Sequence, residues 1–246
     1  MRLLEYVPCP PNWTLDWDGL NERLPDLRRL KTCPQDPVWH AEGNVWVHTR
    51  MVLEALVAMP EWRGMPDRQR QIVFLAALLH DIGKVYCTKT EEDGRITSRG
   101  HSRRGAVDAR KLLWRLGVPF VLREAIAGII QYHQIPFFLL DRADSRRLAL
   151  RTSLLACNRH LALHAIADAR GRICEDQAGI LGNVELFEHY CEELGCLDGP
   201  YPFPDAHTRF SYFRSDGRPP DVPIFDVPVS RWCSCQVFPE RVRIIG

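Results

Sequence analysis

Apolar residues recur at spacings of three and four along most of the chain, the pattern of helices that bury one face. Proline and glycine fall mainly between the segments that show this pattern, which are residues 45–56, 68–82, 102–116, 121–134, 145–170 and 176–194. A further short helix is predicted within residues 16–30. The pattern therefore predicts an all-α fold, most economically a helical bundle.

Other stretches depart from the helical pattern. Residues 85–98 place Ile96-Thr97 just after Asp93-Gly94, which predicts a small β-turn or hairpin insertion. Aromatic residues between 201 and 213 are expected to anchor a proline-rich extended tail, and a strand is predicted within residues 236–246. We therefore predict an irregular N-terminal segment, a helical domain and a Pro/aromatic-rich C-terminal extension, at residues 1–38, 39–197 and 198–246.

Composition changes this picture little. The chain has 246 residues, 46% of them hydrophobic and 26% charged, as in an ordinary globular protein. A net charge of +1 excludes a global basic field that would indicate a nucleic-acid partner. The N-terminal sequence lacks a secretion signal, and no apolar run approaches the roughly 20 residues that span a bilayer. A cytoplasmic location with no membrane partner is expected.

The first candidate chemistry lies at the end of a strongly apolar helix. His80-Asp81 follows the run QIVFLAALL and precedes Ile82-Gly83-Lys84. Two adjacent ligands at a helix end can turn an imidazole nitrogen and a carboxylate oxygen toward one ion, and Gly83 is expected to supply the helix stop. The surrounding run makes this pair more informative than an isolated His-Asp dipeptide.

His48 and Asp168 are candidates for the same site. His48 falls on the apolar stripe of the helix before His80, and Asp168 is expected near the C-terminal end of a helix, where the dipole disfavours a carboxylate unless a cation offsets it. Imidazole and carboxylate ligands together suit a first-row transition ion with open positions for water. The pattern therefore predicts a metal centre rather than satisfied core residues.

The order His48, His80-Asp81, Asp168 resembles the motif of the HD superfamily of metal-dependent phosphohydrolases. That resemblance implies an HD-domain helical bundle, and it adds His101 and His133, which match family members that hold two metals. Asp81 would then be the bridging carboxylate between two divalent ions about 3.5–4 Å apart. Mn, Ni, Co, Fe and Zn are not distinguished by these ligands.

A denser resemblance covers most of residues 35 to 215. The segments WHAEGNVWVHT, GHSRRGA, YHQIPFFLL and PYPFPDAHTRFSYF are similar to the HD module of bacterial two-part RNA end-healing enzymes, which join it to a polynucleotide kinase. This implies phosphoesterase action on 2′-phosphate or 2′,3′-cyclic phosphate RNA ends. The kinase motif G-x-x-x-x-G-K-[ST] is missing from the sequence, so we expect a stand-alone, truncated or diverged version. A weaker resemblance runs to the HD domain of bacterial tRNA nucleotidyltransferases.

Several basic residues are candidates to hold the substrate phosphate. Lys84 is three residues after Asp81, and Arg103 and Arg104 stand beside His101 at a predicted helix start, where an anion is favoured. Arg104 is preferred and, with Asp81 and Lys84, is assigned a catalytic role. Arg103, Arg170 and Arg172 are predicted, with Arg104, to bind substrate.

The remaining histidines are predicted not to be metal ligands. His160, His164 and Asp168 share one helical face and offer an alternative metal-site design. His160 is two turns from Asp168, too far for one ion since a turn rises about 5.4 Å, so His160 is predicted to lie on the surface. His164 is predicted to support a ligand, and His40 to serve turn structure.

These features leave more than one function open. The leading interpretation is an HD-type phosphohydrolase acting on RNA ends, with a separate kinase or ligase as the implied partner. A nucleotidase acting on free phosphorylated nucleotides would use the same ligands. A non-catalytic module that binds phosphate or nucleotide is the third interpretation. A missing metal ligand would have supported it, but all six candidate ligands are present in the sequence.

Overall fold

The computed structural model describes residues 3–214, and within them the fold is predominantly helical, as predicted. The short strands β1 Lys89–Thr90 and β2 Ile96–Thr97 form its two-stranded sheet. The helical elements are η1 Leu3–Tyr6, α1 Trp17–Arg23, η2 Pro25–Thr32, α2 Val45–Ala58, α3 Pro60–Arg63, α4 Asp67–Leu79, α5 Lys84–Cys87, α6 His101–Arg115, α7 Phe120–Tyr132, α8 Ile135–Phe138, α9 Ser145–Leu155, α10 Asn158–Arg170, α11 Gln177–Glu193 and α12 Ala206–Arg214.

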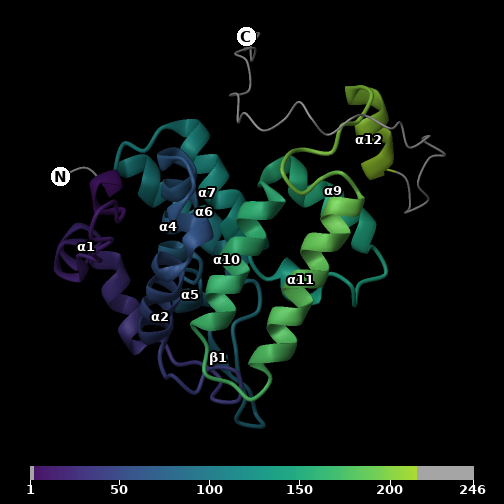
Figure 1. Cartoon of the computed structure of the whole chain (residues 1–246). Coiled ribbons are helices and arrows are strands. Elements are labelled where there is room, and N and C mark those ends of the chain that lie inside the picture. The colour runs from purple at the N-terminus through teal and green to yellow at the C-terminus, as the bar shows by residue number, and fades with distance from the viewer. Residues whose placement is uncertain (1–2, 215–246) are drawn as a thin grey trace, which may run out of the picture.

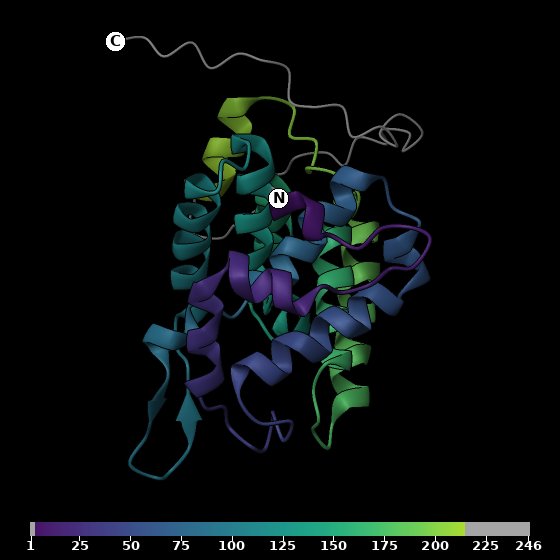
Figure 2. The same ribbon diagram turned by 90° about the vertical axis from the view of Figure 1, so that its left-hand side faces the viewer.

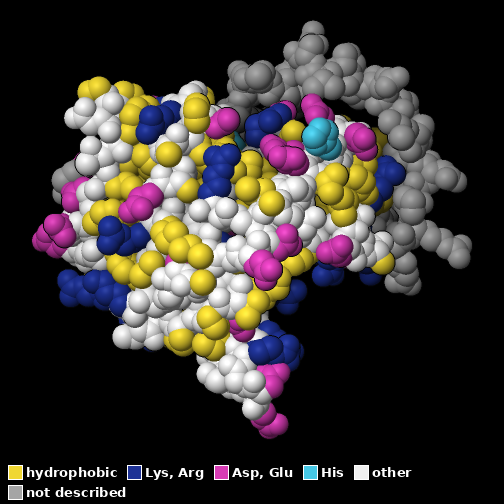
Figure 3. All heavy atoms as spheres, turned by 60° about the horizontal axis from the view of Figure 1, so that its bottom comes forward, with side chains coloured by type: hydrophobic (Ala, Val, Ile, Leu, Met, Phe, Trp, Pro, Cys, Tyr) yellow, Lys and Arg dark blue, Asp and Glu magenta, His cyan; other side chains and the backbone are white. Residues whose placement is uncertain are grey.

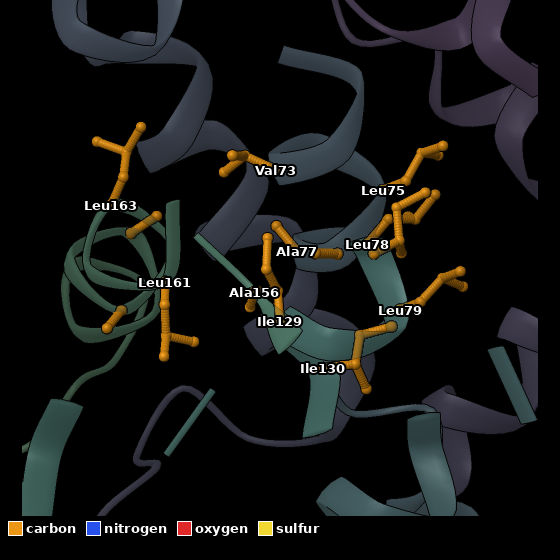
Figure 4. Packing of buried hydrophobic residues seen from close by; sticks show 14 of the residues in the cluster. Val73, Leu75, Ala77, Leu78, Leu79, Ile129, Ile130, Ala156, Leu161 and Leu163 are labelled. Carbon is orange, nitrogen blue, oxygen red and sulfur yellow. The ribbon is translucent and has the colours of Figure 1, made fainter. Parts of the chain in front are cut away.

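The helices pack around one hydrophobic core. α4 lies at its centre, packed against α2, α7 and α10, and α10 packs against α11, which runs beside it in Figure 1. Figure 4 shows the core where Leu79 of α4, Ile130 of α7 and Leu161 of α10 face the interior. Burying such side chains is the main driving force for assembling these helices. The packing brings the ends of α2, α4, α6, α7 and α10 within reach of one another.

The predicted helix over residues 145–170 is two helices. Ala156 is extended (φ −148°, ψ 153°) between α9 and α10. Asn158 is fully buried, and its amide donates to the carbonyl oxygens of Ala149 (3.2 Å) and Cys196 (2.9 Å). The α9 terminus also packs on Gly128, where an added Cβ would lie 2.2 Å from the Leu155 oxygen. These tertiary contacts break a segment whose local pattern is continuously helical.

The N-terminal segment contains the short helix predicted within residues 16–30, as α1 and η2, and is otherwise largely irregular. Leu20, Leu24, Leu27 and Leu30 are fully buried in the common core, and η2 packs against α2. Figure 2, which looks onto this flank, shows the segment lying across the outside of the bundle. The leucines recur at helical spacing, so the signal for this short helical region was present between the prolines.

The hairpin is present where it was predicted. Lys89 pairs with Thr97 and Thr90 with Ile96 in antiparallel register, and Gly94 has a φ of +83° in the turn. A glycine suits this turn because it adopts positive φ without a Cβ clash. The hairpin projects from the lower end of the molecule in Figure 1.

The extension is not wholly extended, because α12 follows its proline-rich start. Phe203 stacks on Tyr201 (ring centroids 4.8 Å apart), Tyr212 (5.6 Å) and Phe213 (5.8 Å), so the predicted aromatic anchoring is present. The strand predicted within residues 236–246 lies outside the described residues. From residue 3 to residue 214, no helix is both long enough and apolar enough to cross a membrane.

Candidate metal centre

The His80-Asp81 pair follows the last residue of α4, and both side chains are buried. We predicted that Gly83 stops the helix. The structure does not show this, because α4 already ends at Leu79 and Gly83 has right-handed helical dihedral angles, with a φ of −70° and a ψ of −20°. A Cβ at Gly83 would instead lie 2.2 Å from the His101 oxygen and 2.6 Å from the Gly105 nitrogen. The missing side chain lets the chain after Asp81 pack directly on the start of α6, which brings His101 to Asp81.

A first cluster joins three helices. His48 of α2, His80 of α4 and Asp168 of α10 each offer one ligand atom within 4.8 Å of the others. Nε2 of His48 lies 3.1 Å from Oδ1 of Asp168. All three side chains are buried, so bulk water has little access to these ligand atoms.

A second cluster lies beside the first and contacts it through Asp81. Ligand atoms of Asp81, His101 and His133 also lie within 4.8 Å of one another. Oδ1 of Asp81 is 3.3 Å from Nε2 of His101, whereas Oδ2 is 3.2 Å from Nε2 of His80. Asp81 therefore turns one carboxylate oxygen toward each cluster, the position of a bridging ligand.

The four imidazoles of the two clusters are held in the same way. Each Nδ1 contacts a backbone carbonyl oxygen: His48 that of Gly171 at 3.1 Å, His80 that of Ala77 at 2.8 Å, His101 that of Ser98 at 2.7 Å and His133 that of Ile130 at 2.8 Å. Because a carbonyl only accepts, each Nδ1 carries a proton, so in the neutral form of each ring Nε2 is the nitrogen left to ligate a metal. The backbone thus fixes the tautomer that ligates a metal.

The unpaired polar atoms fit a cation. Within the described part of the chain, buried atoms without a hydrogen-bond partner include Nε2 of His48 and of His80, Oδ1 of Asp81 and Oδ2 of Asp168. Buried polar atoms are normally satisfied. In addition, Nε2 of His101 and Nε2 of His133 are 3.2 Å apart, where two neutral rings would oppose their lone pairs. Positive ions held between these atoms would satisfy them.

The carboxylates of the centre are ionised. Burial raises the pKa of Asp81, but the neighbouring His80 and Lys84 outweigh burial and hold it well below its usual value. Burial likewise raises the pKa of Asp168, and Arg172 and His48 reverse that effect. Both groups therefore present negative oxygens, as a metal ligand must.

The imidazoles of the second cluster favour the neutral form. Burial lowers the pKa of His101 and holds the pKa of His133 well below its usual value. At His48, burial lowers the pKa, but Asp168 and Glu42 outweigh it and raise the pKa. A metal ion at the first cluster would therefore compete with a proton on His48.

Residues 45–157 match the family model of the HD domain. The chain carries an HD domain. The matched range contains His48, His80-Asp81, His101 and His133, while Asp168 lies beyond its end. The superfamily resemblance that those residues indicate is thus confirmed, together with the all-α fold.

The chain is similar to multifunctional CCA proteins and to a CC-adding tRNA nucleotidyltransferase. The multifunctional CCA protein of Ralstonia nicotianae is 33% identical over 175 residues, which cover 66% of this chain and 36% of that protein. That of Pasteurella multocida is 28% identical over 204 residues, 78% of this chain and 46% of that protein. The CC-adding tRNA nucleotidyltransferase of Thermus thermophilus is 34% identical over 156 residues, 63% of this chain and 30% of that protein.

The chain thus spans less than half the length of these relatives, between 30% and 46%. They correspond to the weaker of the two resemblances seen in the sequence, that to tRNA nucleotidyltransferases. The resemblance to RNA end-healing enzymes bears on substrate and is taken up under the proposed function.

Two of the basic residues predicted to bind phosphate, Lys84 and Arg172, lie beside the two clusters. Nζ of Lys84 is 2.8 Å from Oδ2 of Asp81 and donates to Oε1 of Gln35 at 2.7 Å. Nη2 of Arg172 is 2.9 Å from Oδ1 of Asp168. Each candidate ligand carboxylate therefore has one basic partner beside it.

The other predicted cations point elsewhere. Arg103, Arg104 and Arg170 are exposed. Nε of Arg104 donates to Oδ2 of Asp108 at 2.6 Å, and its guanidinium lies 4.2 Å from the ring centre of Tyr86. Arg104 was preferred over Arg103 as the arginine that faces the substrate, but its guanidinium is engaged by Asp108 and Tyr86 rather than by the clusters, so its catalytic role stays a prediction.

The other histidines are more buried than predicted. His160 is 7% exposed and not a surface residue, since α10 is covered on that side too. His164 is fully buried, with its ring centre 5.2 Å from that of His80 and 5.8 Å from that of His133. It therefore packs against two candidate ligands, but neither ring nitrogen makes a hydrogen bond, so its supporting role stays a prediction.

Two residues of the centre were missed from the sequence. Gln35 holds Lys84, and Glu42 contacts both His40 and His48 through Oε1, at 2.7 Å and 2.9 Å. Both lie in the irregular chain before α2, where no periodicity indicates which side chains turn inward. The segment WHAEG was noted for its place before the site, but its glutamate carried no signal.

Proposed function

We propose that this chain is a metal-dependent phosphohydrolase that removes phosphate from 2′-phosphate or 2′,3′-cyclic phosphate ends of RNA. The observation that carries the proposal is the convergence of four imidazole Nε2 atoms, with each Nδ1 tied to a backbone carbonyl, on the carboxylates of Asp81 and Asp168. Such a ligand set suits divalent transition ions and leaves coordination positions open for other groups.

Two ions fit the two clusters. His48, His80 and Asp168 would hold one, His101 and His133 the other, and Asp81 would hold both. When bound, the ions supply Lewis-acid activation of the phosphoryl group and of the attacking water. The protein's own contribution is to fix the ligands from separate helices in one buried, preorganised arrangement.

The neighbouring cations complete the site. Lys84 and Arg172 keep Asp81 and Asp168 ionised and add positive charge beside the two clusters, which favours binding of a phosphate dianion there. Arg103, Arg104 and Arg170, being exposed, would act only on parts of the substrate beyond the reacting phosphate.

The choice of an RNA end rests on two supports. The sequence segments around His48, His101 and His133 resemble the HD module of RNA end-healing enzymes, and the relatives named above include a CC-adding tRNA nucleotidyltransferase. Basic, acidic and apolar side chains are interspersed on the face seen in Figure 3, rather than gathered in one basic field. Such a surface suits recognition of a terminus more than of a long duplex.

Substituting Asp81→Asn tests the proposal, because it preserves the side-chain shape and removes the shared negative charge. Loss of an outer hydrogen-bond partner of a metal ligand already costs roughly 10–100-fold in activity. We therefore expect metal-stimulated phosphate release from an RNA 2′-phosphate or cyclic phosphate end to fall by more than about 100-fold. Release is measured with Mn²⁺, Ni²⁺, Co²⁺, Fe²⁺ and Zn²⁺ in turn.

Asp67→Asn is the matched control, since the Asp67 side chain is 84% exposed on α4 and should leave activity unchanged. Comparing 2′-AMP, 3′-AMP and 5′-AMP with the RNA ends separates an RNA-end enzyme from a nucleotidase. Undiminished turnover in Asp81→Asn contradicts the proposed activity.

A further inference from the structure

Glu42 lies behind the metal centre and contacts it through a ligand. Its side chain is 1% exposed, and Oε1 lies 2.9 Å from Nδ1 of His48 and 2.7 Å from Nδ1 of His40. Oε2 accepts a hydrogen bond from the backbone nitrogen of Ile173 at 2.9 Å. Burial raises the pKa of Glu42, but the bonds from His40, His48 and Ile173 outweigh it and hold the pKa well below its usual value. The carboxylate is therefore ionised and fixed in place.

His48 differs from the other candidate imidazole ligands in this contact. Nδ1 of His80, His101 and His133 donates to a backbone carbonyl three residues earlier in the chain. Nδ1 of His48 has the Gly171 carbonyl and, in addition, a carboxylate. A carboxylate on the distal nitrogen orients the ring and makes the metal-facing nitrogen a stronger donor.

We infer that Glu42 is a positioning residue for His48, strengthening the metal position of His48, His80 and Asp168 and leaving that of His101 and His133 unaffected. The inference rests on the metal centre of the proposed function. It follows from the geometry, because Glu42 contacts His48 through Nδ1, on the side of the ring away from the Nε2 atom that would ligate the metal.

Glu42 is not itself a ligand of a third ion with His40 and His48, although their ligand atoms lie within 4.8 Å of one another. A third ion there would need a bare Nδ1 on His48. The Gly171 carbonyl, 3.1 Å from that nitrogen, requires a proton on it. A positioning role is the one consistent with both contacts.

The test uses Glu42→Gln, which keeps the shape and an oxygen for the Ile173 nitrogen but removes the charge. Affinity for Co²⁺ is measured by competition with a chelator, in the full chain and in a His133→Ala background that isolates the first position. We expect Glu42→Gln to weaken the first position by roughly 10–100-fold. The second position should keep its affinity, and the metal-free chain its melting temperature.

Asp36→Asn is the matched control. Asp36 lies in the same loop and its carboxylate likewise accepts from backbone nitrogens, those of Val38 (3.0 Å) and Ile96 (3.3 Å). Unchanged Co²⁺ affinity in Glu42→Gln overturns the inference, as does an equal loss in Asp36→Asn or a third ion per wild-type chain. A wild-type chain that binds no Co²⁺ refutes the proposed function itself, which distinguishes the two failures.

Discussion

The groups around each buried histidine distinguish the candidate metal ligands from the other buried histidines. Those of the two clusters have one nitrogen tied to the backbone and the other facing a carboxylate or a second imidazole. His164 and His160 are buried without such a carboxylate contact, and burial lowers their pKa to about 3 and about 4. Burial alone therefore does not distinguish a candidate ligand from a core histidine, whereas the tautomer and the facing group do.

His160 makes the metal-free fold sensitive to acid. Its pKa in the folded chain is about 4, against a usual value of 6.5, because burial disfavours the charged ring. The unfolded chain therefore takes up the proton first, so the stability contribution is present above pH 6.5 and is lost as the pH falls toward 4. The difference corresponds to at most ~3 kcal/mol, from about 1.4 kcal/mol for each pKa unit.

Urea unfolding of the metal-free chain between pH 7 and pH 4 measures this effect. We expect the free energy of unfolding of wild type to fall by up to ~3 kcal/mol more than that of His160→Gln over this range. His189→Gln is the control, because His189 is exposed and its curve should parallel wild type. Parallel curves for wild type and His160→Gln would show that His160 does not titrate as described.

At the scale of elements, the junction of α4, α5 and α6 builds the centre. Gly83→Ala would place a methyl group 2.2 Å from the His101 oxygen, against backbone that cannot yield without moving α6. We expect a loss of roughly 1–3 kcal/mol of stability, as for other overpacked sites. Because the displaced segment carries Asp81 and faces His101, metal binding should weaken as well.

Gly182→Ala is the opposite case and the control for that experiment. Gly182 lies inside α11, and a Cβ there meets nothing within 4 Å. Alanine in a helix interior is favoured over glycine by up to about 1 kcal/mol, so this variant should be slightly more stable. Thermal unfolding of both variants checks the pair, and a Gly83→Ala chain as stable as wild type would contradict the packing described.

The sequence predicts elements well where local pattern decides and poorly where tertiary contacts decide. The helices that carry His48, His80, His101 and His133 are long and periodic, and the structure has them at nearly the predicted bounds. The break at Ala156 depends on the buried Asn158 amide and cannot be seen in the 145–170 pattern. The leucines of residues 20–30 show the converse, since a short helix was predicted there despite the neighbouring prolines and is present.

For the candidate site, the sequence identified the metal ligands by residue type, but it did not show which other side chains contact them. The candidate ligands stood out because histidine and aspartate are rare on apolar stripes. Lys84 and Arg172 were among several basic candidates, and sequence could not show which of them would pair with Asp81 and Asp168. Glu42 was not found, because its role is set by a loop that the structure folds against His48 and Ile173.

At the scale of the whole molecule, the centre is where the helices meet. The candidate ligands come from α2, α4, α6, α7 and α10 or the residues directly after them, so they are far apart in sequence and adjacent only in the folded chain. The surrounding fold therefore acts as the rigid support that a metal centre needs. The matched HD range supplies all of these ligands except Asp168, which α10 adds, within a chain that spans less than half the length of the multifunctional CCA proteins it resembles.

The most direct test of the account is anomalous diffraction from crystals of the wild-type chain loaded with Mn²⁺ or Co²⁺. The account predicts two peaks, one among His48, His80 and Asp168 and one between His101 and His133, each beside one oxygen of Asp81. Their separation should be about 3.5–4 Å, as in other two-metal sites. Saturated crystals with no ion at these residues, or with ions bound only elsewhere, would contradict it.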